Sequence, residues 1–188
     1  MNKRFNSKKL EKLNNPERLE MIPPAYIWNV IAPVHHTDKV EIGAGTGLFS
    51  REFQKISGRG KTFALDISED MISWMKENII EDFPSIIPMK TDGKVLPLAD
   101  NLADIIYTIT MHHEVGDPGE MLCEARRILR KEGRIFIADW NMNRMDSGPP
   151  AEIRCTAEEV ASQLDEAGFP DVRIDPGFDN FFLVTARG

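Results

Sequence analysis

The segment Val-Glu-Ile-Gly-Ala-Gly-Thr-Gly, residues 40–47, has the composition of a ligand-binding loop. Its glycines, Gly43, Gly45 and Gly47, follow a short apolar run and precede a stretch with helical spacing. Glycine lets a backbone turn tightly and approach a ligand closely, and in an open α/β sheet ligands bind beyond the carboxyl ends of the strands. Leu48 stands where the dinucleotide fingerprint G-x-G-x-x-G requires its third glycine. The spacing therefore predicts a ligand loop, but it does not meet the dehydrogenase pattern.

Two carboxylates near this loop indicate which ligand it binds. Glu41 precedes the first glycine, and a negative charge there would repel a pyrophosphate but attract the ammonium and sulfonium of S-adenosylmethionine. Asp66 follows Gly47 by 19 positions, at the end of the second apolar run, where a carboxylate can accept both hydroxyls of a ribose. Asp66 could instead be a charge at the N-terminus of the helix that Ser68 opens. Together the two carboxylates favour an adenosine cofactor, and S-adenosylmethionine in particular.

His112 and His113 are the candidate catalytic residues. If the ligand is S-adenosylmethionine, the expected reaction is transfer of its methyl group, a direct displacement that needs no acid or base when the acceptor and the methyl group are held in line. A general base helps when the acceptor is a weak nucleophile, and histidine suits that role near neutral pH. We favour His113 slightly, because it lies farther into the predicted loop, while a packing or solvated role is an equal alternative for each histidine.

Asp139, after the fifth apolar run, is placed at the same edge as the two histidines. It could act on the acceptor, or it could accept a hydrogen bond from a loop. A metal site made of His112, His113 and Asp139 lacks a recognisable ligand spacing. No metal is therefore predicted.

Short apolar, β-branched runs alternate along the chain with longer stretches of helical spacing, which is typical of βαβ units. Five runs are short, apolar and bounded by Gly, Pro or Asp, as buried parallel strands are. They are residues 40–42, 62–65, 86–89, 105–109 and 135–138. Two more strands are expected near 172–174 and 181–185. We predict an α/β fold: a Rossmann-like, mostly parallel seven-stranded sheet with helices on both faces.

Helix boundaries can be predicted from capping patterns. Asp117, Pro118 and Glu120 form an N-cap, a first-turn proline and an acidic N3 residue, and the helix is expected to run past Leu129, with Gly133 just beyond. A second capping box pairs Thr156 with Glu159, and Gly168 is expected after that helix ends. Two further amphipathic helices are expected over 48–56 and after Ser68.

Composition limits the class of protein. The 188 residues are enough for one domain with a sizeable core, and no apolar run approaches the ~20 residues of a transmembrane helix, so we expect a cytoplasmic protein. Lys plus Arg minus Asp plus Glu is 23 − 30 = −7, a charge that disfavours a nucleic-acid partner. Cys123 and Cys155 are too few for a disulfide framework. A small-molecule acceptor is favoured, and the oligomeric state is left open.

Further segments resemble the class I S-adenosylmethionine-dependent methyltransferases, specifically the small, ubiquinone-biosynthesis type of methyltransferase domain. The resemblance runs from about residue 38 to 188. Beyond the glycine loop and Asp66, the segments that carry it are Thr91-Asp92-Gly93 with Leu96-Pro97-Leu98, Asp104 to Tyr107, Met111-His112-His113, Arg127 to Arg130 with Gly133, and Ala167-Gly168-Phe169.

This resemblance implies a cofactor, S-adenosylmethionine, and the residues that bind it. Its methionine part would lie near Glu41 and the glycines, its ribose and adenine near Asp66 and Ile67, and its adenine amine near Asp92. The full implied set is Glu41, Gly43, Ala44, Gly45, Gly47, Asp66, Ile67, Asp92, Gly93 and Ile109.

The chain is accordingly predicted to have an N-terminal helical cap, 1–37, and an S-adenosylmethionine-binding methyltransferase domain, 38–188. In the first part, Asn15-Pro16 could open one short helix, and Pro23-Pro24 could begin another that continues through Ile31. This segment could cap the carboxyl edge of the sheet, or its helix could pack on one face. The sequence leaves both arrangements open.

We predict a methyltransferase acting on a small molecule. One alternative is a protein that binds S-adenosylmethionine without transferring its methyl group. Another is an NAD(P)-dependent oxidoreductase, which would share the fold. Tyr26 and Tyr107 are the chain's tyrosines, and the fourth residue after each is Val30 or Met111. The Tyr-x-x-x-Lys pair of one class of these oxidoreductases is therefore missing.

Overall fold

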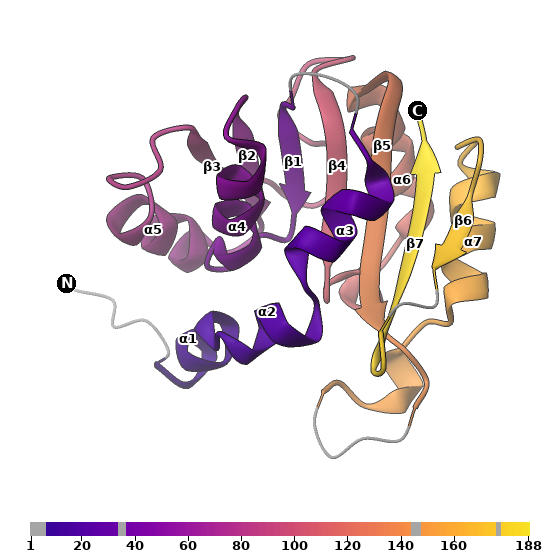
Figure 1. Cartoon of the computed structure of the whole chain (residues 1–188), viewed down its shortest axis with the longest axis horizontal. Coiled ribbons are helices and arrows are strands. Elements are labelled where there is room, and N and C mark those ends of the chain that lie inside the picture. The colour runs from indigo at the N-terminus through magenta and orange to yellow at the C-terminus, as the bar shows by residue number, and fades with distance from the viewer. Residues whose placement is uncertain (1–6, 34–36, 144–147, 176–177) are drawn as a thin grey trace.

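The structure, a computed structural model, describes residues 7–33, 37–143, 148–175 and 178–188. In these ranges seven strands form one sheet in the order β3-β2-β1-β4-β5-β7-β6, and β7 runs antiparallel to both of its neighbours. This confirms the predicted Rossmann-like, mostly parallel sheet (Figure 1). The strands are β1 (Lys39–Ile42), β2 (Thr62–Asp66), β3 (Ile86–Lys90), β4 (Ala103–Ile109), β5 (Leu129–Trp140), β6 (Arg173–Asp175) and β7 (Phe181–Arg187).

Helices cover both faces of the sheet, as predicted. Apolar residues of α3 and α4 share one buried cluster with Ile105 and Tyr107 of β4, and α5 packs on Ala64 of β2 on the same side. Helices α6 and α7 pack on the other face, against Val40 and Ile106. The helices are α1 (Ser7–Asn14), α2 (Glu17–Met21), α3 (Pro24–Ile31), α4 (Leu48–Ser57), α5 (Glu69–Asn78), α6 (Pro118–Ile128) and α7 (Ala157–Glu166), with 3-10 turns η1 (His112–Glu114) and η2 (Ala151–Ile153).

Both predicted capping patterns are present. The Asp117 side chain accepts a hydrogen bond of 3.0 Å from the backbone N–H of Glu120, with a proline at the first helical position. Thr156 and Glu159 form a reciprocal capping box at the start of α7, and Gly168 after that helix has the left-handed φ of +81°. The N-termini of α6 and α7 are thus set by local hydrogen bonds.

The end of α6 differs from the prediction. The helix ends at Ile128, and Leu129 already belongs to β5, which is much longer than residues 135–138. Leu129 pairs with Ala103, whereas Arg134 pairs with Ile105, so the register shifts between the two pairs. Leu129 therefore contributes its apolar side chain to the sheet and not to the last turn of the helix.

The N-terminal helices occupy two different positions on the sheet. Helix α3 packs on the sheet face, where Ile27 and Ile31 are buried against Phe49 and Phe53 of α4. Helix α2 lies instead below the carboxyl ends of β1 and β4, and α1 continues from it below α4 and α5 (Figure 1). The sequence left a choice between a packed helix and a segment over the carboxyl edge, and the described residues show both arrangements.

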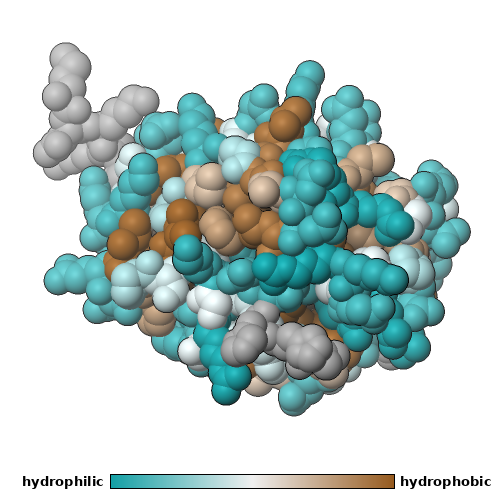
Figure 2. Space-filling view, turned by 90° about the horizontal axis from the view of Figure 1, so that it is seen from above, coloured by the Kyte–Doolittle hydropathy of each residue, from teal (hydrophilic) through white to brown (hydrophobic). Residues whose placement is uncertain are grey.

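The opposite end of the molecule, at the amino ends of the parallel strands, is viewed from above in Figure 2. Hydrophilic side chains prevail around its rim, and hydrophobic ones gather toward its centre. Within the described ranges, no helix is long and apolar enough to cross a membrane.

Candidate functional site

Buried ionisable side chains gather at the carboxyl edge of the sheet. Most of the buried charged and histidine side chains in the described ranges lie where a parallel strand ends. They are Glu41 at the end of β1, Asp66 at the end of β2, His112 after β4 and Asp139 at the end of β5, whereas Lys39 lies at the start of β1. Burying such groups is costly unless they are hydrogen-bonded, and clusters of them are typical of functional sites. This edge is therefore the candidate site.

Strand β1 decides which way Glu41 points. Side chains alternate along a strand, so Val40 and Ile42 face α6 and α7 whereas Glu41 faces α4 and lies beside Tyr107. The Ser50 hydroxyl donates a hydrogen bond to the Glu41 carboxyl, and the Tyr107 hydroxyl lies 3.4 Å from the same oxygen. The sequence analysis predicted neither residue as a partner of Glu41.

Burial changes the expected charge of Glu41. Its side chain is only 2% exposed, and loss of hydration raises its pKa to about 8, against the opposing effects of the Ser50 hydrogen bond and the Arg18 charge. At neutral pH the carboxyl is mostly protonated. The predicted repulsion of a pyrophosphate by a charged Glu41 therefore does not hold in the structure without a ligand.

Hydrogen bonds from its backbone to β2 fix the conformation of the glycine loop. Gly43 and Gly45 have φ of +77° and +58°, a region that residues with a side chain rarely occupy. The backbone N–H groups of Gly43 and Ala44 both donate to the Leu65 carbonyl at 2.8 Å. The Gly45 N–H donates to Asp66 Oδ2 at 2.7 Å. Asp66 thus connects the second strand to the loop.

Asp66 is oriented by two backbone donors. Its second oxygen, Oδ1, accepts a hydrogen bond of 2.8 Å from the N–H of Ser68, immediately before α5. Each carboxylate oxygen can accept more than one hydrogen bond, so a ribose hydroxyl could still bind. The structure therefore shows the helix-start role that the sequence left open, and it leaves capacity for the ribose role.

The next predicted residues surround an exposed apolar position. Ile67 is 69% exposed although it directly follows a buried strand, and Val95 is 67% exposed. Gly93 has a φ of +82°, and a side chain there would touch Ile67. Asp92 is exposed, and its Oδ1 accepts from the N–H groups of Lys94 and Val95, which lowers its pKa. These residues form the side of the site beside β2 and β3.

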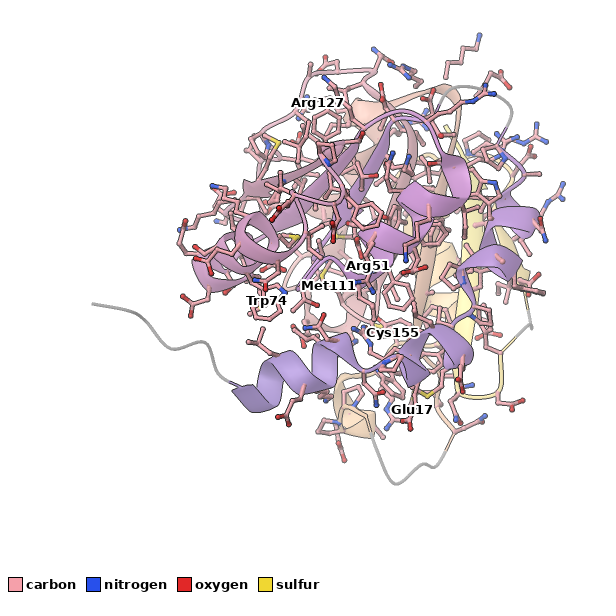
Figure 3. All side chains as sticks on the ribbon, turned by 60° about the vertical axis from the view of Figure 1, so that its left-hand side comes forward. Glu17, Arg51, Trp74, Met111, Arg127 and Cys155 are labelled. Carbon is pink, nitrogen blue, oxygen red and sulfur yellow. The ribbon has the colours of Figure 1, made fainter. Side chains whose placement is uncertain are left out.

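Other neighbours of the loop were not foreseen. Met111, which follows β4, packs against Gly43 so closely that a Cβ on that glycine would overlap the methionine side chain. Leu13 of α1 faces Gly45 from the other side, 3.6 Å from where a Cβ would be. In Figure 3, Met111 lies between the sheet and the N-terminal helices.

Two residues of the predicted cofactor set are buried in the core. Ile109 is packed with the cluster beneath α3 and α4, and Ala44 lies in the cluster beneath α5. Their side chains support the loop and the end of β4 from below. The predicted residues therefore lie together at one edge of the sheet, and Ala44 and Ile109 are buried beneath that edge.

His113 is held by Asp139. Its ring Nδ1 lies 2.8 Å from Asp139 Oδ1, and its backbone N–H donates to Oδ2 at 3.0 Å. Because a carboxylate only accepts, Nδ1 carries the hydrogen and Nε2 is the nitrogen able to take a proton. Burial lowers the pKa of His113, but the hydrogen bond and charge of Asp139 outweigh it, so the pKa is raised.

His112 has a different environment. Its Nε2 lies 2.7 Å from Oε1 of Gln163 on α7, and its Nδ1 is buried with no partner among the described residues. Burial lowers its pKa, and the Gln163 bond and the Asp139 charge only partly offset that. His112 therefore joins η1 to α7 in its neutral form. Neither histidine belongs to a metal cluster, since the described side chains contain no group of three or more His, Cys, Asp or Glu placed to hold an ion.

Arg18 is a further site residue that the sequence analysis missed. It extends from α2 to the carboxyl edge, where its Nη2 donates to Thr110 Oγ1 at 2.8 Å and its Nη1 donates to the Leu13 carbonyl at 2.8 Å. The guanidinium also lies over the ring of Phe49, 5.1 Å from its centre. No local sequence pattern could indicate a contact that joins residues 92 positions apart.

Comparison with known proteins adds to this geometry. Residues 40–137 match the family model of a methyltransferase domain. The ubiquinone/menaquinone biosynthesis C-methyltransferase of Roseobacter denitrificans is 32% identical over 114 residues, covering 59% of this chain and 45% of that protein. An uncharacterized chloroplastic methyltransferase of Arabidopsis thaliana is 26% identical over 79% of this chain and 46% of that protein. The chain spans less than half the length of these relatives.

One solved structure matches nearly the whole chain. The crystal structure of an S-adenosylmethionine-dependent methyltransferase from Aquifex aeolicus is 28% identical, with a TM-score of 0.89, and the match covers 97% of this chain and 98% of that one. The similarity includes the N-terminal helices as well as the sheet, because so little of either chain lies outside it.

Proposed function

Since this chain belongs to the methyltransferase domain family, as the sequence motifs predicted, we propose that it transfers the methyl group of S-adenosylmethionine to a small-molecule acceptor. The observation that carries the proposal is the bond between Gly45 N–H and Asp66 Oδ2. It places a glycine loop of positive φ and a buried carboxylate side by side at the carboxyl edge, where an adenosine ligand binds in this kind of sheet. The matching Aquifex structure supports the same cofactor.

Each end of the cofactor has matching residues. The amino-acid end would lie at the loop of Gly43, Gly45 and Gly47, close to Glu41. The ribose would bind Asp66, whose oxygens retain acceptor capacity. The adenine would contact exposed Ile67, and Asp92 and Gly93 would lie beside it. Ala44 and Ile109 would act from below, as buried supports of this surface.

His113 is the proposed general base. When bound, S-adenosylmethionine supplies an electrophilic methyl carbon on a sulfonium. The reacting atom of the acceptor would bond to that carbon, and the electrons of the carbon–sulfur bond would remain on the sulfur. Nε2 of His113 would take the acceptor's proton. Asp139 keeps the ring in the tautomer that this requires and stabilises its protonated form. His112 is proposed to support the loop through its contact with Gln163 of α7, in keeping with the slight preference for His113 in the sequence analysis.

The acceptor is therefore proposed to lose a proton, as a hydroxyl or an acidic C–H group does. An acceptor of that kind gains from a base, whereas a neutral amine is already a nucleophile. The C-methyltransferase relative of Roseobacter denitrificans is consistent with this chemistry. The predicted N-terminal cap is proposed to cover the site through α1 and α2, because Leu13 of α1 and Arg18 of α2 lie at its edge.

Two measurements test the proposed function. Titration calorimetry should detect binding of S-adenosylmethionine and much weaker binding of NAD. Incubation of a metabolite extract with methyl-labelled cofactor, followed by mass spectrometry, should then identify a labelled small molecule. Tighter binding of NAD would contradict the cofactor assignment. Binding of S-adenosylmethionine without any transfer to small molecules or proteins would instead favour a non-catalytic binding protein.

A further inference from the structure

Arg18 is a cation with neutral hydrogen-bond partners. Its side chain is half-buried, and its two bonds go to a carbonyl and a hydroxyl. In the described part of the chain, Arg18 forms no ion pair with a carboxylate. Burial lowers its pKa, and the carboxyl of Glu41 opposes that only partly. Charges removed from water are normally paired, so this guanidinium lacks an anion.

Its surroundings favour an anion as well. The ring beneath it, Phe49, belongs to the first turn of α4. That turn contains no acidic side chain, and the N-cap residue before it, Gly47, provides no side-chain cap. The N-terminus of a helix carries a partial positive charge and free N–H groups. The partial positive charge of α4 therefore arises in the same helical turn that carries the ring beneath Arg18.

The glycine loop contains a buried hydroxyl without a hydrogen-bond partner. Thr46 is 1% exposed, and its Oγ1 has no hydrogen-bond partner among the described residues. It lies within the glycine loop, one residue before Gly47. Buried polar groups are almost always hydrogen-bonded in folded proteins, so the loop beside Leu13 and Arg18 contains a polar group whose hydrogen-bonding capacity is unused.

Thr110 fixes the position of the cation. It follows β4 with a φ of +52°, which is rare for a β-branched residue. Such a conformation persists where the surrounding structure determines it, and here it aims Oγ1 at Arg18. Leu13, whose carbonyl accepts the other bond, packs over Gly45. The guanidinium is thus held beside the glycine loop by both of its partners.

We propose that Arg18 binds the carboxylate of the amino-acid end of S-adenosylmethionine, so that α2 supplies part of the cofactor site. A carboxylate would supply the missing negative charge, and the guanidinium keeps further N–H groups for it, because only two of its five are used by Leu13 and Thr110. This inference rests on the proposed function. It also gives the N-terminal segment a direct role in the affinity for the cofactor.

The test compares two ligands that differ in this carboxylate alone. Calorimetry would measure S-adenosylmethionine and its decarboxylated analogue, which keeps the ammonium and the sulfonium, with the full chain and with Arg18→Gln. We expect the unmodified protein to prefer S-adenosylmethionine by about tenfold to a hundredfold. Arg18→Gln should lose most of that preference while binding the analogue as before. Arg18→Lys, which keeps the charge, should retain part of it and covers the case in which the Gln variant fails to fold.

Arg126 offers a matched control. Its guanidinium also lies over a phenylalanine ring, that of Phe169, but on α6 at the other face of the sheet. Arg126→Gln should keep the full preference. Unchanged discrimination in the Arg18 variants, or an equal loss for both ligands, would overturn the assignment and leave Arg18 as a structural support. If the unmodified protein binds neither ligand, the proposed cofactor itself is wrong and the inference fails with it.

Discussion

Asp139 accepts two hydrogen bonds from the same residue, His113: one from the ring at 2.8 Å and one from the backbone at 3.0 Å. The pair joins the end of β5 to the turn after β4. Because both oxygens of the carboxylate are engaged, the imidazole is fixed in tautomer and in direction, and Nε2 is the nitrogen that can act on an acceptor.

The histidine variants should behave differently. With an acceptor that must lose a proton, His113→Ala should lower kcat by about 10²–10⁴-fold, because general bases contribute that much, while cofactor affinity stays nearly unchanged. His112→Ala should keep most of the turnover and lose thermal stability, since it removes the bond to Gln163. Steady-state kinetics would measure kcat, titration calorimetry would measure cofactor affinity, and thermal unfolding would measure stability. Wild-type turnover in both variants would show that neither histidine is the base.

The pH profile follows from the raised pKa of His113. A base must be unprotonated, so kcat should rise with pH through a value above the ordinary 6.5 and then level off. Asp139→Asn removes the larger of the two charges that raise this pKa; the weaker effect of Glu114, 3.8 Å from Nε2, and the effect of burial, which lowers the pKa, both remain. The acid limb of that variant should therefore move to lower pH. A limb that stays in place would exclude His113 as the titrating group.

Asp66→Ala should weaken S-adenosylmethionine binding by about tenfold to a hundredfold, because hydrogen bonds to a charged group contribute roughly 1.5–3 kcal/mol. Glu69→Ala is the matched control, since it removes an exposed carboxylate from the first turn of α5. It should bind the cofactor normally. If Asp66→Ala only lowers the melting temperature and keeps its affinity, Asp66 serves the loop and the helix start alone.

Glu41 should make the ligand-free protein less stable as pH rises. Its pKa is about 8 when folded and near 4.5 when unfolded, so between these values the folded state holds a proton that the unfolded state has lost. The unfolding free energy should fall across this window, by on the order of a few kcal/mol. Urea unfolding at pH 5, 7 and 9 would measure it. Glu41→Gln should remove this part of the fall, and parallel pH curves for the two proteins would refute the raised pKa.

Asp117→Ala should cost about 1 kcal/mol of unfolding free energy, the usual value of an N-cap, because the N–H of Glu120 loses its acceptor. Chemical denaturation would measure the change. Asp165→Ala, inside α7, is a control that caps no helix and should change stability less. An undiminished midpoint in Asp117→Ala would mean that water replaces the cap at no cost.

The sequence by itself determined the features that depend on neighbours in the chain. The strands, the helix starts at Asp117 and Thr156, and the glycine loop are set by periodicity, capping and backbone freedom within a few residues. The edge shared by Glu41, Asp66 and the histidines followed too, because parallel strands bring their carboxyl ends together. The end of α6 could not be predicted from the sequence, because the register of β5 against β4 decides whether Leu129 belongs to the helix or to the sheet.

Only the tertiary structure decided what those residues meet. His112 and His113 are adjacent in the chain, yet one faces Gln163 and the other Asp139, so their pKa values shift in opposite directions. Glu41 is uncharged at neutral pH because α4 and β4 exclude water from it. Arg18 reaches the site from a segment whose local pattern predicts only helices. Charge state and contact depend on burial and on partners far away in the chain, which no short stretch of sequence encodes.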